Sequence, residues 1–172
     1  MDHIHFDVEP AFDWLLYDYS GAVAAAPMPV KHYISQKSEC KGDVMQNIYA
    51  SLVSTPLKYI GFLDDDQIIS VSDLNKLFFI ATLEKLDVFQ PSLNHDSYYN
   101  LRQFIHKPGY LVQDTWWVEI MSPFYSEAVF QAAGVEALAM AVDDAVDQHA
   151  VDPAFQDGRH RKPPQRELQD QQ

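Results

Sequence analysis

The 172-residue chain has little cysteine, few basic side chains and no long apolar run. Its single cysteine, Cys40, excludes an internal disulfide and a zinc site built on cysteines. Twelve Lys and Arg against 25 Asp and Glu give a net charge of -13, which disfavours binding to nucleic acid or anionic membranes. No segment has the length of a spanning helix, and the first residues do not resemble a signal peptide. We therefore expect a cytoplasmic protein with no stable membrane insertion.

The composition indicates one globular domain followed by a polar tail. Apolar residues make up 47% of the chain and aromatic residues 13%, which is typical of a folded protein. Residues 147–172 consist mostly of Asp, Gln, Arg, His and Pro, and bury too little apolar surface to offset the entropy of ordering. We expect a domain over residues 1–146 and a disordered tail over residues 147–172.

Apolar runs separated by turn signals predict an α/β fold. We expect strands at residues 12–19, 31–35, 59–63, 87–91, 110–112 and 116–121, and helices at residues 41–52, 70–86 and 126–142. The second helix has a start signal, because Ser70 and Asp73 resemble a capping box. The run at residues 59–63 is nearly all apolar, as in an inner strand of a parallel sheet covered on both faces. Residues 92–108 are expected to form a long loop over the site.

Three consecutive carboxylates, Asp64, Asp65 and Asp66, directly follow the apolar run at residues 59–63. Ligands of open α/β sheets bind beyond the carboxyl ends of strands, and adjacent like charges need solvent, donors or a cation to offset them. Asp64 and Asp66 together suit a hard divalent cation, which prefers oxygen ligands and often bridges to phosphate. The triplet thus predicts a metal and diphosphate site, with Asp64 and Asp65 facing the nucleotide. The alternative is a solvated acidic loop before the next helix.

Four other residues are candidates for the site or for ordinary structural roles. Asp18 ends a predicted strand, where it would meet a nucleotide or form a turn. Lys41 opens a predicted helix, where it would contact phosphate or remain exposed. Trp116 and Trp117 would stack on an acceptor sugar or fill the core. Consecutive side chains of a strand point to opposite faces, so at least one of the two tryptophans should be exposed or lie in a ligand site.

Glu119 is the candidate general base. A carboxylate near the end of a strand, beside two tryptophans, would activate an acceptor hydroxyl. The alternative is a carboxylate on the solvent face of its strand, or one paired with a nearby Lys or Arg.

Three blocks of sequence carry a resemblance to a known family: residues 59–66 (YIGFLDDD), 90–93 (QPSL) and 117–126 (WVEIMSPFYS). Together they resemble the domain-of-unknown-function family 707, which is itself similar to A-type glycosyltransferases. The blocks lie in the family's order, and the resemblance covers about residues 12–130. The family continues with a Gly-Trp-Gly-Leu-Asp type motif that this chain lacks, so we expect a fold that is truncated or divergent at its C-terminal end.

The resemblance implies a Rossmann-like sheet, a D-x-D loop and a metal-dependent transfer of sugar from a nucleotide-sugar donor. Asp66 would bind Mn²⁺ or Mg²⁺ on the donor diphosphate, and Asp64 would bind the ribose or the water shell of the metal. The region that the chain lacks commonly supplies acceptor contacts and often the catalytic carboxylate. The resemblance therefore implies a glycosyltransferase with an unknown glycan or small-molecule acceptor, and possible impairment of its activity.

Two alternative functions remain from the residues alone. One is a non-catalytic module that keeps the fold and binds a nucleotide-sugar or another partner. The other is a Mg²⁺-dependent phosphotransferase or hydrolase, which is weakened because the chain has no Gly-rich phosphate loop of the P-loop type.

Overall fold

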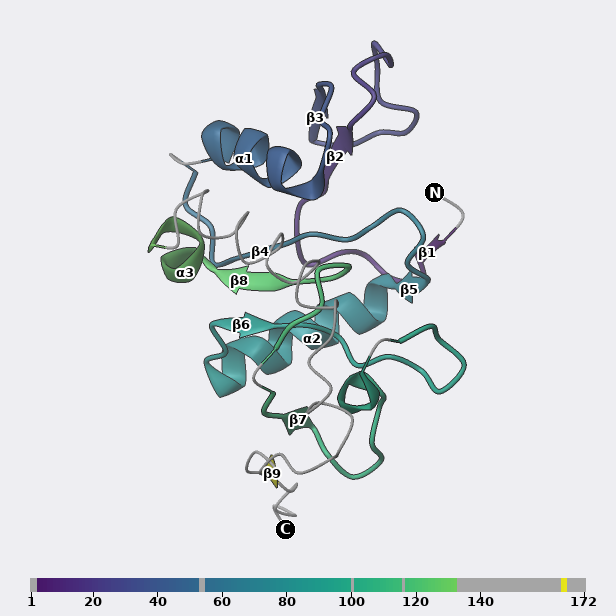
Figure 1. The fold of residues 1–172 in the computed structure, drawn as a ribbon, viewed down its shortest axis with the longest axis vertical. Helices are drawn as coiled ribbons and strands as arrows, with labels where there is room; N and C mark the ends of the chain where they lie inside the picture. The colour runs from purple at the N-terminus through teal and green to yellow at the C-terminus, as the bar shows by residue number, and fades with distance from the viewer. Residues whose placement is uncertain (1–2, 53–54, 100, 116, 133–164, 167–172) are drawn as a thin grey trace, which may run out of the picture.

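The computed structural model describes residues 3–52, 55–99, 101–115, 117–132 and 165–166. Its elements confirm the α/β class (Figure 1). The helices are α1 (Lys41–Leu52), α2 (Val71–Glu84), α3 (Glu127–Ala132) and the 3-10 turn η1 (Arg102–Phe104). The strands are β1 (Ile4–His5), β2 (Leu15–Asp18), β3 (His32–Ser35), β4 (Tyr59–Gly61), β5 (Ile69–Ser70), β6 (Val88–Phe89), β7 (Val112–Gln113), β8 (Phe124–Ser126) and β9 (Gln165–Arg166).

The central sheet has three strands in the order β4-β8-β6, and both outer strands run antiparallel to β8. The expected place of residues 59–63 inside a parallel sheet is therefore wrong, because β4 lies at an edge and pairs with an antiparallel strand. β4 and β6 are nevertheless parallel to each other and joined through α2, with β8 between them (Figure 1). β2 and β3 form a separate parallel pair.

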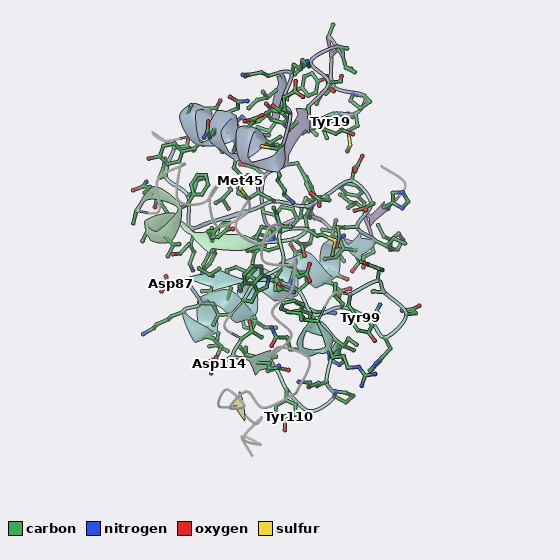
Figure 2. All side chains as sticks on the ribbon, viewed as in Figure 1. Tyr19, Met45, Asp87, Tyr99, Tyr110 and Asp114 are labelled. Carbon is green, nitrogen blue, oxygen red and sulfur yellow. The ribbon has the colours of Figure 1, made fainter. Side chains whose placement is uncertain are left out.

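Two apolar clusters cover the two faces of this sheet, as the sequence predicts for β4. On one face, Met45 and Ile48 of α1 pack with Phe62 and with Phe130 of α3. Figure 2 shows Met45 between α1 and the sheet. On the other face, α2 packs on β6 and β8 through a cluster of Leu74, Ala81, Phe89 and Phe124. Tyr59 and Ile60 belong to different clusters, because neighbouring side chains of a strand point to opposite faces.

The strand expected at residues 116–121 is wrong for the described part, residues 117–121, and Trp116 lies outside the described residues. The strand comes later, at β8, directly after Pro123. Phe62 N–H donates to Pro123 O at 3.0 Å and Asp64 N–H donates to Met121 O at 3.2 Å, which extends the β4–β8 register beyond the strands. Pro123 has no N–H to return a bond, so the pairing there is one-sided.

Local signals in the sequence placed the helices well. α1 has the predicted bounds, and α2 begins after Ser70, whose hydroxyl accepts a hydrogen bond from Asp73 N–H as the capping box predicts. α2 ends at Lys85, which adopts the left-handed conformation with φ of 54° and returns its N–H to Ala81 O. α3 follows Ser126 as predicted, and the expected extension of this helix to residue 142 lies outside the described residues.

The remaining expectations are met in part. The strands expected at 12–19, 31–35 and 87–91 contain β2, β3 and β6, and the loop at 92–108 contains η1. β7 is displaced from the expected strand at 110–112 and pairs with β9. β9 lies in the tail expected to be disordered, whereas the other tail residues and the expected boundary at 146 lie outside the described ranges. In the part of the chain that is described, no helix is long and apolar enough to cross a membrane.

Candidate functional site

Lys41 and Asp64 meet beside the carboxyl end of β4 and join three segments that are distant in sequence. Lys41 Nζ lies 2.5 Å from Asp64 Oδ1, 2.5 Å from the carbonyl oxygen of Ile120 and 3.3 Å from that of Met121. An ammonium has three N–H donors, so these three oxygens can accept all of them. These three oxygens form a cation-binding position, called the seat below, which the Lys41 ammonium occupies.

The chain positions both members of this pair through backbone structure. Lys41 is the first residue of α1, which confirms its predicted place at a helix entrance. Asp64 is fixed by its N–H bond to Met121 O at 3.2 Å, and its own carbonyl accepts from Gln67 N–H at 3.3 Å. The loop after β4 is therefore anchored to the segment that supplies the two carbonyls around Lys41.

Burial and charge act in opposite directions on Lys41. Its side chain is 17% exposed, and burial lowers the pKa of its ammonium, while the hydrogen bond and charge of Asp64 and the charge of Asp66 raise it. Asp64 is 37% exposed, so solvent screens the pair and its net contribution to stability is small. The charge of Asp66 therefore also acts on the ammonium, without a direct contact between the two groups within the described structure.

Asp65 and Asp66 lie on the exposed part of the loop. Asp66 Oδ1 accepts a long hydrogen bond of 3.4 Å from Gln67 Nε2, and Gln67 also reaches Met121 Sδ at 4.0 Å. Unlike Asp64, neither carboxylate has a salt bridge within the described residues. Their oxygens thus remain open to solvent and to a ligand.

The residues around this loop fit a divalent cation in chemistry but do not enclose one. The described residues contain no group of three or more His, Cys, Asp or Glu that could hold a metal. Asp64 and Asp66 supply two carboxylates, and Mg²⁺ is often bound by one or two carboxylates with water and substrate phosphate as the other ligands. The Lys41 ammonium already places a positive charge against Asp64, where a metal ion would lie. This contact supports the fit of these residues to a metal ion that also binds a phosphate ligand.

Asp18 is placed as predicted at the end of β2, but its carboxylate accepts hydrogen bonds from the loop that follows it and from Ser35 of β3. Oδ1 accepts from Ser20 N–H at 3.0 Å and Ser20 Oγ at 2.7 Å, while Oδ2 accepts from Val23 N–H at 3.0 Å and Ser35 Oγ at 2.7 Å. These bonds, led by those of the two serine hydroxyls, lower the pKa of Asp18. This is the turn-forming alternative, and a nucleotide contact of Asp18 stays a prediction.

Glu119 lies next to the seat in sequence, but it is buried. Its side chain is 5% exposed, and its backbone N–H donates to Gln90 Oε1 at 2.5 Å. A carboxylate on the solvent face of a strand, one of the alternatives for Glu119, is therefore wrong. Trp117 is half-buried. The proposed roles of both residues stay predictions.

Gln90 and the carbonyls of Ile120 and Met121 are site features that the sequence did not assign. Gln90 lies just after β6, and its carboxamide takes the place of a backbone acceptor for Glu119, while its Nε2 is buried without a hydrogen-bond partner in the described structure. The only available signal was its position in the 90–93 block. The carbonyls gave no signal, because every residue carries one.

An open groove lies elsewhere among the described residues, near the amino ends of β4 and β6. It has a volume of about 610 Å³ and includes Lys58, Lys85, Asp87 and Ser126 in its lining. None of the predicted site residues borders it. The Lys41–Asp64 pair consists of two predicted site residues, so it is a better candidate for the functional site than this groove.

Comparison with known proteins adds no relative. No protein-family model matches the chain, and neither a curated protein nor a solved structure is significantly similar to it. The resemblance to family 707 and to A-type glycosyltransferases therefore stays a prediction from the three blocks.

Proposed function

We propose that this protein binds a nucleotide-sugar donor together with Mn²⁺ or Mg²⁺ and transfers the sugar to an acceptor, as a metal-dependent glycosyltransferase. The observation that supports this proposal is the cation seat after β4, where Asp64 holds a positive charge and Asp66 lies near it. The proposed fold is the Rossmann-like sheet of A-type transferases, supported by the α/β elements and by the three sequence blocks.

The proposal gives each residue a defined task. Asp64 and Asp66 would hold the cation, and Asp64 and Asp65 would face the nucleotide. A divalent cation bound to the donor diphosphate supplies charge stabilisation for the leaving group. Lys41 would contribute a second positive charge to the same diphosphate.

The other proposed roles lie farther from the seat. Asp18 would contact the nucleotide, Trp116 and Trp117 would contact the acceptor, and Glu119 would accept the proton of the acceptor hydroxyl. For Glu119 this requires a movement, because a general base must come within hydrogen-bond distance of that proton.

Metal dependence tests the proposal directly. We expect UDP or GDP to bind in the presence of Mn²⁺ and to lose at least about tenfold in affinity in excess EDTA, because diphosphate and carboxylates repel each other without a cation. Isothermal titration calorimetry with both nucleotides measures this. UMP and GMP, which keep the base and lack the β-phosphate, are the matched controls and should bind weakly under both conditions. Equal UDP or GDP affinity with and without EDTA would contradict the metal site.

The burial of Glu119 favours a second candidate, a nucleotide-sugar-binding module without efficient transfer. We expect measurable donor binding with little transfer to acceptors in assays of several UDP- and GDP-sugars with Mn²⁺, because Glu119 is buried, with 5% of the residue exposed. Robust transfer by the wild type would overturn this candidate. In that case Glu119→Gln should abolish transfer at unchanged donor affinity, whereas Glu9→Gln on the exposed N-terminal segment should not.

A further inference from the structure

Lys41 occupies the carboxylate to which the proposed metal would bind. Its ammonium is 2.5 Å from Asp64 Oδ1 and has its two other close contacts with the carbonyls of Ile120 and Met121. These are three oxygen acceptors for one cation, and all three N–H donors of Lys41 can be used at the seat. Lys41 therefore has no donor left for a phosphate as long as it remains there.

A divalent cation and the ammonium cannot both sit against the same carboxylate oxygen. The two positive charges would repel each other, and the small seat is already filled by Nζ. If the cation takes Oδ1 of Asp64, Lys41 must leave at least this one of its three acceptors. The side chain is long and starts at the first residue of α1, so its released ammonium stays near the loop after β4.

We propose that Lys41 is an internal competitor of the divalent cation, and that metal binding releases its ammonium for the donor diphosphate. This inference rests on the proposed function and adds regulation of the same site. In the absence of donor, Lys41 keeps Asp64 neutralised and lowers metal affinity. When metal and diphosphate arrive together, the metal replaces Lys41 on Asp64 and the ammonium moves to phosphate oxygen.

The consequence is a coupling between the two ligands. Phosphate oxygens of the diphosphate replace the oxygens that the Lys41 ammonium loses when the metal binds Asp64. The diphosphate therefore increases the affinity of the site for the metal. By linkage, the metal must then increase diphosphate affinity by the same factor. Without Lys41 this part of the coupling disappears, while the direct attraction between metal and diphosphate remains.

Lys41→Gln tests the competition when Mn²⁺ is titrated alone and followed by calorimetry or by the spin-resonance signal of free Mn²⁺. We expect Mn²⁺ to bind about fivefold tighter than to the wild type, which is the scale set by a partly exposed ion pair. Lys37→Gln is the matched control, because it also removes one lysine, from an exposed pair with Glu39 at 2.9 Å. It should leave Mn²⁺ affinity within about twofold, since exposed charges are screened. Equal Mn²⁺ affinity of Lys41→Gln and wild type would overturn the proposal.

The coupling is measured by repeating the Mn²⁺ titration with saturating UDP or GDP. We expect the increase in Mn²⁺ affinity caused by the nucleotide to be about fivefold smaller in Lys41→Gln than in wild type and in Lys37→Gln. An unchanged coupling would overturn the release of the ammonium to the diphosphate. Lys41→Met replaces Lys41→Gln in both titrations if circular dichroism shows that the glutamine variant does not fold.

The two hypotheses fail in different ways. If wild type binds UDP or GDP with Mn²⁺ but Lys41→Gln has wild-type metal affinity, the competition is wrong and the proposed function stands. If neither nucleotide binds to any variant while Lys41→Gln binds Mn²⁺ more tightly, the proposed function is wrong and the competition for Asp64 stands.

Discussion

Gly61→Ala is expected to destabilise the protein by about 3 kcal/mol or more, at the upper end of the range for overpacked cores. A Cβ at residue 61 would lie 2.1 Å from Phe124 Cε1 and 2.3 Å from Phe124 Cδ1, far inside contact distance. The Phe124 ring is 2% exposed and cannot move aside easily. It stacks on Phe89 at 5.4 Å between centroids and meets the edge of Phe78 at the same distance.

Urea unfolding followed by circular dichroism measures this loss, and two variants identify its cause. Phe124→Leu introduced into Gly61→Ala should recover part of the stability, because the smaller side chain leaves space for the new methyl group. Gly109→Ala has no atom within 4 Å of its added Cβ, so it reports only the cost of a left-handed backbone with φ of 89°. A Gly61→Ala protein as stable as wild type would contradict the close packing of β4 on Phe124.

The same substitution is relevant to the site. Gly61 ends β4, and three residues later Asp64 is fixed by its N–H bond to Met121 O. If the alanine methyl group pushes β4 away from β8, the one-sided bonds that continue this pairing should break first. The packing of Gly61 therefore links the core to the position of the carboxylate that holds Lys41.

The helices could be predicted from sequence because their signals are local. Apolar spacing located α1 and α2, and the Ser70 cap fixed the start of α2 to the residue. The partners of β4 depend on contacts between residues that are far apart, to which local patterns do not respond. The apolar run at residues 59–63 indicated cover on two faces correctly but did not specify that its neighbour is antiparallel β8.

Pro123 explains the misplaced strand. The sequence suggests that a proline stops a strand, and residues 117–121 are apolar enough to be the strand before it. In the structure Pro123 lies directly before a strand, β8, and not after one. Its carbonyl oxygen accepts a hydrogen bond from Phe62 N–H. A proline can occupy such a position because only its carbonyl is needed.

The residues of the candidate site could be predicted from the sequence, but the contacts between them could not. Lys41 and Asp64 were both candidates from sequence, for a phosphate contact and for a metal contact. Their ion pair spans 23 residues and depends on how α1 packs beside the loop after β4. Asp18 shows a different limit: its carboxylate looked suited to a ligand, but it is already hydrogen-bonded by Ser20 of the following turn and by Ser35 of β3.

Asp66→Asn is expected to weaken Mn²⁺-dependent binding of UDP or GDP by at least about tenfold, because even residues that only orient a metal ligand cost about 10–100-fold when mutated. The amide keeps the shape of the side chain and removes the charge that attracts the cation. Asp65→Asn is the matched control: it removes the same charge from the adjacent exposed residue of the loop. It should weaken nucleotide binding less than Asp66→Asn does, because the proposal gives Asp65 a contact with the nucleotide but none with the metal, and exposed charges are screened.

Calorimetry at constant Mn²⁺ and ionic strength compares the two variants, with urea unfolding as the check on folding. Both should keep wild-type stability, since neither carboxylate has a salt bridge within the described residues. Equal weakening by Asp65→Asn and Asp66→Asn would mean that the triplet attracts cations only through its summed charge, as a solvated acidic loop does. A larger loss in Asp65→Asn would assign the metal to Asp65. Only a selective loss in Asp66→Asn supports a directional cation site formed by Asp64 and Asp66, because summed charge does not depend on which of two neighbours is removed.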